Sequence, residues 1–279
     1  MEKLVVIMKK IILFPLLITT LFVHAQLGYM GLKQSTSTYS IIIMNGESNS
    51  GGRAPNTSAT AAEQLARTNT KILNNYTLGF ENLQIGVNNL MLHYLINPSP
   101  NTSEHSWELG IANSVDSGTL TPPVYIVKTG QGGSYIADWA MTGSTLRFWD
   151  TLTKRVDTAN KLITAANRGY IPRMYLFYTL GINDAIANTD TAVWKTKVKS
   201  YFSNLRSRYG NLPIFITYIP VAYSNFNIKI TEICREISDC YPIATSDLAL
   251  QADGNHWTYL SQKTIAARMI YTLKSFYNF

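Results

Sequence analysis

The chain has 279 residues, a formal net charge of +7 and a charged fraction of only 15%. Its basic residues are scattered, apart from a loose group over residues 195–208 whose spacing is typical of the solvated face of a helix. Aromatic residues are not interleaved with that group, as a surface for single-stranded nucleic acid requires. We therefore expect no nucleic-acid partner, and a globular protein long enough to bury one large core.

The first element in chain order is a targeting segment. Lysines precede an apolar run over residues 11–23, which ends near Ala25 in small residues typical of a cleavage site, although Met8 is an equally good start. The run is shorter than the about 20 apolar residues that span a bilayer. We expect a signal peptide over residues 1–25, secretion or a periplasmic location after cleavage, and one mature domain over residues 26–279 without a membrane span.

Strand-like and helix-like segments then alternate along the chain. Apolar runs predict buried strands at residues 41–44, 124–128, 174–179 and 214–219. Apolar residues at helical spacing predict helices at residues 146–167, 191–209 and about 259–276. This alternation indicates a parallel sheet covered on both faces. Residues 69–95 and 97–121 break the pattern, and we expect insertions over the sheet edge that either build a substrate groove or have no function.

The strand at residues 41–44 runs into the polar turn Gly46-Glu47-Ser48-Asn49-Ser50. Open α/β sheets place ligands at the carboxyl ends of their strands. A serine at such a corner suits a nucleophile for acyl transfer. On this stretch alone Ser48 and Ser50 are equal candidates, and a polar loop without a catalytic role is the alternative.

Three further polar loops follow a predicted strand or precede a predicted helix. They are Thr129–Ser134, Leu180–Asp184 and Asp253–Trp257. In a parallel sheet these loops meet the Ser48 turn at one edge. Each loop taken singly is more typical of a turn or a helix cap, but their joint occurrence favours a common site.

A serine nucleophile needs a general base, a group that orients the base, and donors for the oxyanion. Among His93, His105 and His256, only His256 has a carboxylate three residues earlier, Asp253, which could accept its Nδ1 proton. The candidate oxyanion donors are the backbone N–H groups of Ser48 and Gly132 and the side-chain amide of Asn183.

Cys234 and Cys240 are the only cysteines. An oxidising compartment permits a bridge between them, and that bridge requires any helix through Cys234 to end before Cys240. The alternative is two free thiols. The spacing is not a metal signature and no histidine cluster lies beside it, so we expect no metal site.

The ordered motifs resemble those of the SGNH, or GDSL-type, hydrolase superfamily, whose four blocks carry Ser, Gly, Asn and His. Here the blocks are GESN with Ser48, GQGGS with Gly132, GIND with Asn183, and DGNH with His256. GESN and GQGGSYIADW are similar to the branch of sialate O-acetylesterases and acetylxylan esterases, except that Glu47 replaces the usual Gln of that branch. GIND is more like the general superfamily.

The resemblance implies a three-layer α/β/α sandwich, flavodoxin-like, with a mostly parallel sheet of about five strands. It implies Ser48 as nucleophile, in preference to Ser50, with His256 as general base and then acid and Asp253 as the orienting carboxylate. It also implies an oxyanion hole made by the three donors named above, with Gly133 in place of the second-block donor if that block is offset by one. No metal or organic cofactor is implied.

The predicted function is a secreted serine esterase that removes acetyl or other short acyl groups from carbohydrate, with an acetylated glycan as substrate. Trp107, Trp139 and Trp257 could stack on sugar rings, but core packing is the more common role of each. The sequence leaves open what Glu47 does in place of that Gln. A lipase or thioesterase of the same superfamily would need a long apolar groove, which no apolar run supplies. A non-catalytic glycan-binding protein on the same fold is the other alternative.

Overall fold

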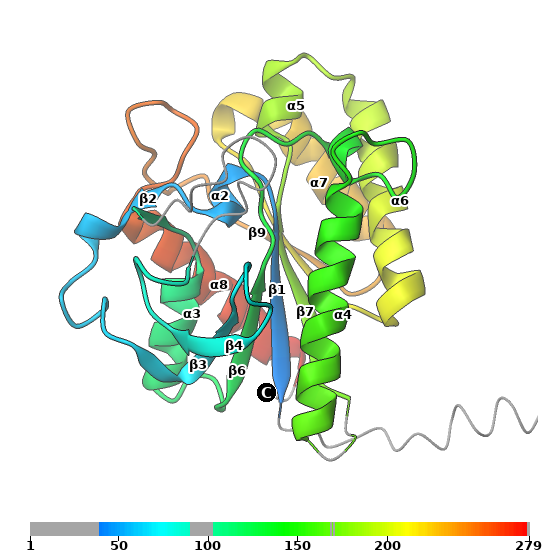
Figure 1. Cartoon of the computed structure of the whole chain (residues 1–279). Helices are drawn as coiled ribbons and strands as arrows, with labels where there is room; N and C mark the ends of the chain where they lie inside the picture. The colour runs from blue at the N-terminus through cyan, green and yellow to red at the C-terminus, as the bar shows by residue number, and fades with distance from the viewer. Residues whose placement is uncertain (1–38, 90–102, 168, 170, 278–279) are drawn as a thin grey trace, which may run out of the picture. The chain divides into compact units, whose positions relative to one another are not determined.

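The computed structural model describes residues 39–89, 103–167, 169 and 171–277 (Figure 1). The predicted signal peptide, its cleavage site and His93 lie outside these residues. Within them, no helix is both long and apolar enough to cross a membrane.

A sheet of seven strands forms the centre, in the order β4-β3-β6-β1-β7-β8-β9. Its strands in chain order are β1 Ser40–Gly46, β3 Arg67–Leu73, β4 Phe80–Leu83, β6 Val124–Lys128, β7 Arg173–Thr179, β8 Ile214–Thr217 and β9 Cys240–Ile243. All neighbouring strands pair in parallel except β4, which runs antiparallel to β3. A separate antiparallel pair joins β2 Ala54–Pro55 to β5 Glu104–His105.

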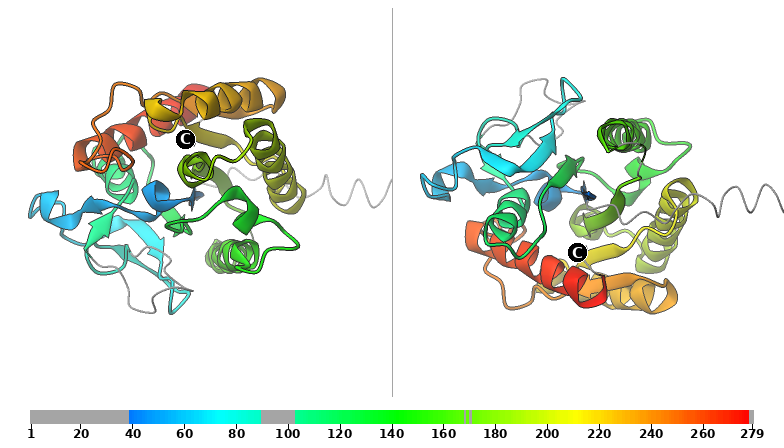
Figure 2. Two further views of the ribbon diagram at one scale, coloured as in Figure 1. Left: turned by 90° about the horizontal axis from the view of Figure 1, so that it is seen from above. Right: turned by 90° about the horizontal axis from the view of Figure 1, so that it is seen from below.

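Helices cover both faces of the sheet, which confirms the predicted three-layer α/β/α class (Figures 1 and 2). The helices are α2 Ser48–Gly51, α3 Glu108–Asp116, α4 Phe148–Ala166, α5 Ile182–Ile186, α6 Thr191–Tyr209, α7 Ser224–Glu236 and α8 Tyr259–Phe276. Short 3₁₀ helices η1, η2 and η3 lie at Asn56–Ser58, Ile136–Trp139 and Val221–Tyr223.

The central strand β1 is buried along its whole length because both of its faces are covered. Successive side chains of a strand point to opposite faces of the sheet. Ile41 and Ile43 accordingly pack in the cluster that includes α4, α6 and α7, and Ile42 and Met44 pack in the cluster that includes α3 and α8. This double burial explains why the strand is one continuous apolar run.

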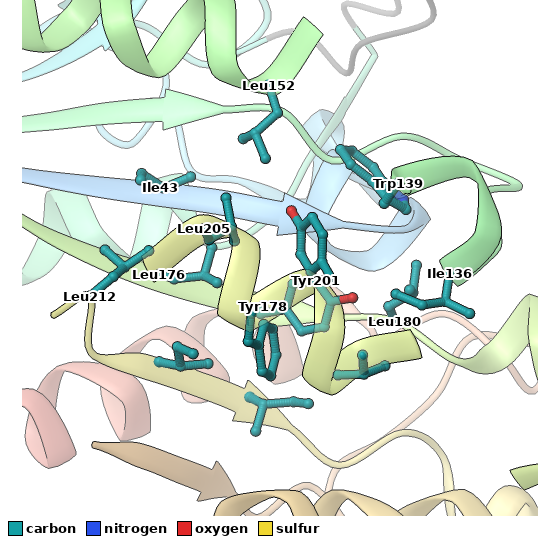
Figure 3. Packing of buried hydrophobic residues seen from close by; sticks show 14 of the residues in the cluster. Ile43, Ile136, Trp139, Leu152, Leu176, Tyr178, Leu180, Tyr201, Leu205 and Leu212 are labelled. Carbon is teal, nitrogen blue, oxygen red and sulfur yellow. The ribbon is translucent and has the colours of Figure 1, made fainter. Parts of the chain in front are cut away.

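The packing beside α6 fixes the carboxyl end of β1 (Figure 3). Tyr201 of α6 lies against Tyr178 of β7, with ring centroids 5.8 Å apart. The Tyr201 hydroxyl donates to Asn45 Oδ1 at 2.6 Å, and Asn45 Nδ2 donates to Thr129 Oγ1 at 3.0 Å. The residue two positions before the Glu47-Ser48 turn is therefore tied to a helix and to the loop after β6.

The four predicted strands and three predicted helices are present; β6, α6 and α8 have the predicted bounds, and the ends of the others are shifted by one or two residues. The sheet has seven strands rather than about five. The strands that the sequence did not reveal are β3, five of whose seven residues are polar, and β4 and β9, which have four residues each. The segment at 97–121 was expected to be an insertion over the sheet edge, and this is wrong for its second half. Helix α3 lies in the core against α8.

Cys234 lies in the last turn of α7, which ends at Glu236, and Cys240 begins β9. The helix thus ends before Cys240, as a bridge would require. The two Sγ atoms lie 2.8 Å apart, and both residues are free cysteines here.

Candidate active site

A sharp turn after β1 places Ser48 at the carboxyl edge of the sheet. Gly46 has φ +122°, and a Cβ there would lie 1.7 Å from the carbonyl oxygen of Thr179, so only glycine fits. The next N–H, that of Glu47, donates to the same Thr179 oxygen at 2.9 Å. Ser48 then begins the short helix α2 and stays half-buried.

The structure separates the two candidate serines. Ser50 is fully buried, and its Oγ donates to the carbonyl oxygen of Glu47 at 2.7 Å. Ser48 Oγ instead lies 2.8 Å from His256 Nε2. Only Ser48 therefore faces the predicted base.

Asp253 completes a chain of three groups with Ser48 and His256. Its Oδ2 lies 2.5 Å from His256 Nδ1, and its Oδ1 accepts the backbone N–H groups of Asn255 at 2.9 Å and His256 at 3.0 Å. Although burial opposes ionisation, these hydrogen bonds lower the pKa of Asp253 to about 2. With an anionic Asp253 accepting the Nδ1 proton, His256 Nε2 is free to accept the proton of Ser48.

Asn49 joins the serine turn to the histidine loop. Its Nδ2 donates to the carbonyl oxygen of Asn255 at 3.0 Å, and its Oδ1 accepts the N–H of Trp257 at 3.2 Å. The side chain is fully buried, so both bonds form away from water. Sequence reasoning did not single out this residue, although its place directly after Ser48 in the GESN block was a usable signal.

The loops of the second and third blocks also meet at the Ser48 turn. The N–H of Gln131 donates to the Gly46 carbonyl at 2.8 Å, which ties the loop carrying Gly132 to the turn. Gly132 is half-buried, whereas Gly133 is exposed with φ +75°. Asn183 lies in the first turn of α5 and is half-buried, and its Nδ2 donates to the carbonyl oxygen of Ser134 at 3.1 Å.

The Glu47 side chain lies inside the protein at the carboxyl edge of the sheet, and not on the surface. Its side chain is fully buried, and its Oε2 accepts Asn183 Nδ2 at 3.1 Å. Burial raises the pKa of Glu47 to about 8, against the lowering effect of hydrogen bonds from the backbone N–H groups of residues 181–183, and the nearby charge of Asp184 adds to the rise. At this position the side chain contacts Asn183, the predicted side-chain donor of the oxyanion hole.

Several other candidate side chains are buried in the core. Trp107, Trp139 and Trp257 are all 0% exposed, so they are core residues, as the more common role of a Trp predicts, and do not stack on a sugar ring. His105 is also 0% exposed, and its Nδ1 lies 3.0 Å from Asn56 Oδ1. Among the described residues, no group of three or more His, Cys, Asp or Glu side chains could hold a metal ion.

The fold is a three-layer α/β/α sandwich with a mostly parallel sheet, and the four ordered loops lie at the carboxyl edge of that sheet. A sequence profile of the family described as "Carbohydrate esterase, sialic acid-specific acetylesterase" matches residues 38–275, and the chain belongs to this family. It is accordingly a carboxylic ester hydrolase of the carbohydrate esterase kind. No sequence of a curated protein matches the chain.

Two solved structures share this fold. A protein from Arabidopsis thaliana is 16% identical, with a TM-score of 0.67, over 85% of this chain and 98% of that one. The protein NanS is 12% identical, with a TM-score of 0.58, over 85% of this chain and 97% of that one. At these identities the likeness supports the fold alone.

Proposed function

We propose that the protein is a secreted serine esterase that removes acetyl or other short acyl groups from carbohydrate. Ser48 is the nucleophile, His256 the general base and acid, and Asp253 the orienting carboxylate. The observation that carries the proposal is the continuous contact from Ser48 Oγ through His256 to Asp253, with distances of 2.8 and 2.5 Å. Contacts of this length connect the three roles that serine hydrolysis requires.

The reaction proceeds through an acyl-enzyme. His256 Nε2 takes the hydroxyl proton of Ser48 as Oγ attacks the ester carbonyl carbon, and the carbonyl oxygen becomes an oxyanion. The N–H groups of Ser48 and Gly132 and the Asn183 side chain stabilise that charge. The tetrahedral intermediate releases the sugar alcohol, which takes the proton from His256. Water then attacks the acyl-Ser48 ester by the same route and releases the carboxylic acid.

Membership of the acetylesterase family supports an acetylated carbohydrate as the substrate. The apolar leader before Ala25 supports secretion or a periplasmic location for a mature chain over residues 26–279. Each step of the proposed reaction is a proton transfer or an acyl transfer performed by the chain's own groups, and no cofactor is part of the proposal.

Ser48→Ala tests the chemistry, with p-nitrophenyl acetate as substrate and Ser200→Ala as the matched control. Ser200 is exposed on α6, and its hydroxyl contacts only its own helix. We expect Ser48→Ala to lower kcat by about 10⁴-fold or more, because a catalytic triad acts as a unit, and Ser200→Ala to match the wild type. Full activity in Ser48→Ala would overturn the assignment.

Acyl and glycan preference test the substrate. We expect acetate release from a panel of acetylated glycans, and faster hydrolysis of acetyl than of octanoyl p-nitrophenyl esters. A preference for octanoyl esters would favour the lipase or thioesterase alternative. Binding of polysaccharide without any labelling of Ser48 by a fluorophosphonate probe would favour a non-catalytic protein.

A further inference from the structure

The environment of Glu47 is unusual for a buried carboxyl group. The four contacts that its oxygens make are all with N–H donors of one short segment. Oε2 lies 3.4 Å from the N–H nitrogens of Gly181 and Asn183 and 3.1 Å from Asn183 Nδ2, and Oε1 lies 3.4 Å from the nitrogen of Ile182. The carboxyl group thus holds the backbone and the side chain of the residue proposed as an oxyanion donor.

Both N–H hydrogens of the Asn183 side-chain amide already have acceptors in this arrangement. A primary amide nitrogen carries two N–H donors. Asn183 Nδ2 directs one to Glu47 Oε2 and the other to the Ser134 carbonyl oxygen, both at 3.1 Å. An oxyanion bound at this position must therefore share a hydrogen that Glu47 or Ser134 already holds.

We propose that Glu47 is a positioning residue for the oxyanion hole: its buried carboxyl group orients the Asn183 amide and competes with the oxyanion for one Asn183 N–H. The inference rests on the proposed function of Asn183. A neutral carboxylic acid accepts this hydrogen bond weakly and gives it up to the oxyanion. A carboxylate accepts it strongly and places a second negative charge beside the charge that develops in the transition state.

The surroundings of Glu47 decide which form is present. The groups that face it are Asp184 on α5, Tyr178 on β7 and Tyr223 on η3, none of which is cationic. The imidazole of His256 contacts the neighbouring residue, with Nε2 2.8 Å from Ser48 Oγ. Burial holds the pKa of Glu47 at about 8, so the neutral acid predominates at pH 7 and is lost as the pH rises. Burial also raises the pKa of Asp184, to about 6, so Asp184 ionises before Glu47.

The test compares wild type, Glu47→Gln and Glu47→Ala in p-nitrophenyl acetate hydrolysis from pH 6 to 10, with the rate of Ser48→Ala subtracted at each pH. Gln has the same shape and cannot ionise. We expect the wild-type kcat to fall about tenfold per pH unit above the pKa of Glu47. This fall should be absent in Glu47→Gln.

The truncation Glu47→Ala tests positioning. We expect it to lower kcat by at least about tenfold, with KM little changed. This loss is smaller than the loss of about 10²–10³-fold that follows removal of an oxyanion donor. Glu236→Gln on the exposed side of α7 is the matched control and keeps the wild-type profile.

The outcomes separate this inference from the proposed function. If the wild type is inactive, or if Ser48→Ala is active, the proposed function fails. If activity depends on Ser48 but Glu47→Gln shows the same alkaline fall as the wild type, Glu47 is not the group that titrates and the inference is wrong. The Glu47→Gln profile decides the matter by itself, so a misfolded Glu47→Ala variant does not affect the conclusion.

Discussion

Two buried carboxyl groups support the Ser48 turn from different sides, and they are held in different ways. Glu108 of α3 pairs with Lys128 of β6, with 2.8 Å between Oε1 and Nζ and with the two side chains 0% and 1% exposed. Its two oxygens also accept the N–H of Ser106, and Ser106 Oγ donates to the Asn49 carbonyl at 2.5 Å. Glu47 is equally buried, but in the described part of the chain its carboxyl oxygens accept hydrogen bonds from neutral N–H groups alone.

The difference shows how a fold can use the same residue type for two purposes. The Glu108 carboxyl group contacts an ammonium group and accepts hydrogen bonds on both oxygens, so it acts as a fixed structural tie. A buried carboxyl group without a cation favours its neutral form, so the charge of Glu47 changes within the working pH range. The first group stabilises the turn, and the second is able to respond to pH.

Breaking the Glu108–Lys128 pair gives the largest expected loss of stability. Lys128→Met leaves Glu108 buried without its cation, and we expect the free energy of unfolding to fall by about 3–5 kcal/mol. Urea unfolding measures this. The double variant Lys128→Met/Glu108→Gln should recover a large part of the loss. If the single and double variants lose the same amount, the pair is not the source of the effect.

Glu47→Gln should change how stability depends on pH. The pKa of Glu47 is about 8 in the folded chain, against an ordinary value of 4.5 for a solvated glutamate, so the folded chain keeps a proton that the unfolded chain has released. Stability therefore falls as the pH rises between these values, by up to about 1.4 kcal/mol per pH unit. Urea unfolding from pH 6 to 8 should show this slope in the wild type and a flatter one in Glu47→Gln. Parallel slopes would contradict the assignment.

Asn49 connects the Ser48 turn to the histidine loop, and its truncation tests what this connection contributes. Asn49→Ala removes the bonds to Asn255 and Trp257 and leaves buried polar groups unpaired. We expect a loss of about 1–3 kcal/mol in the free energy of unfolding. The histidine loop also loses its tie to Ser48, so kcat toward p-nitrophenyl acetate should fall at temperatures where the variant is folded. Unchanged kcat would show that the loop is positioned by other contacts.

An exposed ion pair should give the smallest effect. Glu236 of α7 pairs with Lys195 and Lys199 of α6 at the surface, with 2.5 Å between the charged atoms. Pairs of this kind contribute little because water and salt screen them. We expect Glu236→Gln to leave thermal unfolding and activity unchanged within error. A large change would mean that the exposed carboxylate of Glu236 matters as much to the protein as the buried carboxyl groups of Glu47 and Glu108.

The sequence predicted the parallel core and the histidine loop because both depend on local patterns. Continuous apolar runs indicated β1, β6, β7 and β8. The Asp253-x-x-His256 spacing places the Asp253 carboxylate within hydrogen-bond distance of the His256 imidazole and of two backbone N–H groups in the same loop. Strand β3 was missed because most of its residues are polar, and β9 was missed because Pro242 lies inside it and a proline argues against a strand.

The GESN turn shows where sequence information ends. The sequence alone determined that a glycine-bounded serine follows a buried strand, and the ordered motifs favoured Ser48 over Ser50. Only the tertiary structure decided that Ser50 points into the core and that Glu47 reaches Asn183, 136 residues later in the chain. Burial and long-range contacts set the charge of Glu47, and neither can be read from its neighbours in the sequence. Its role therefore follows from the packing of β1 against β7 and not from the motif.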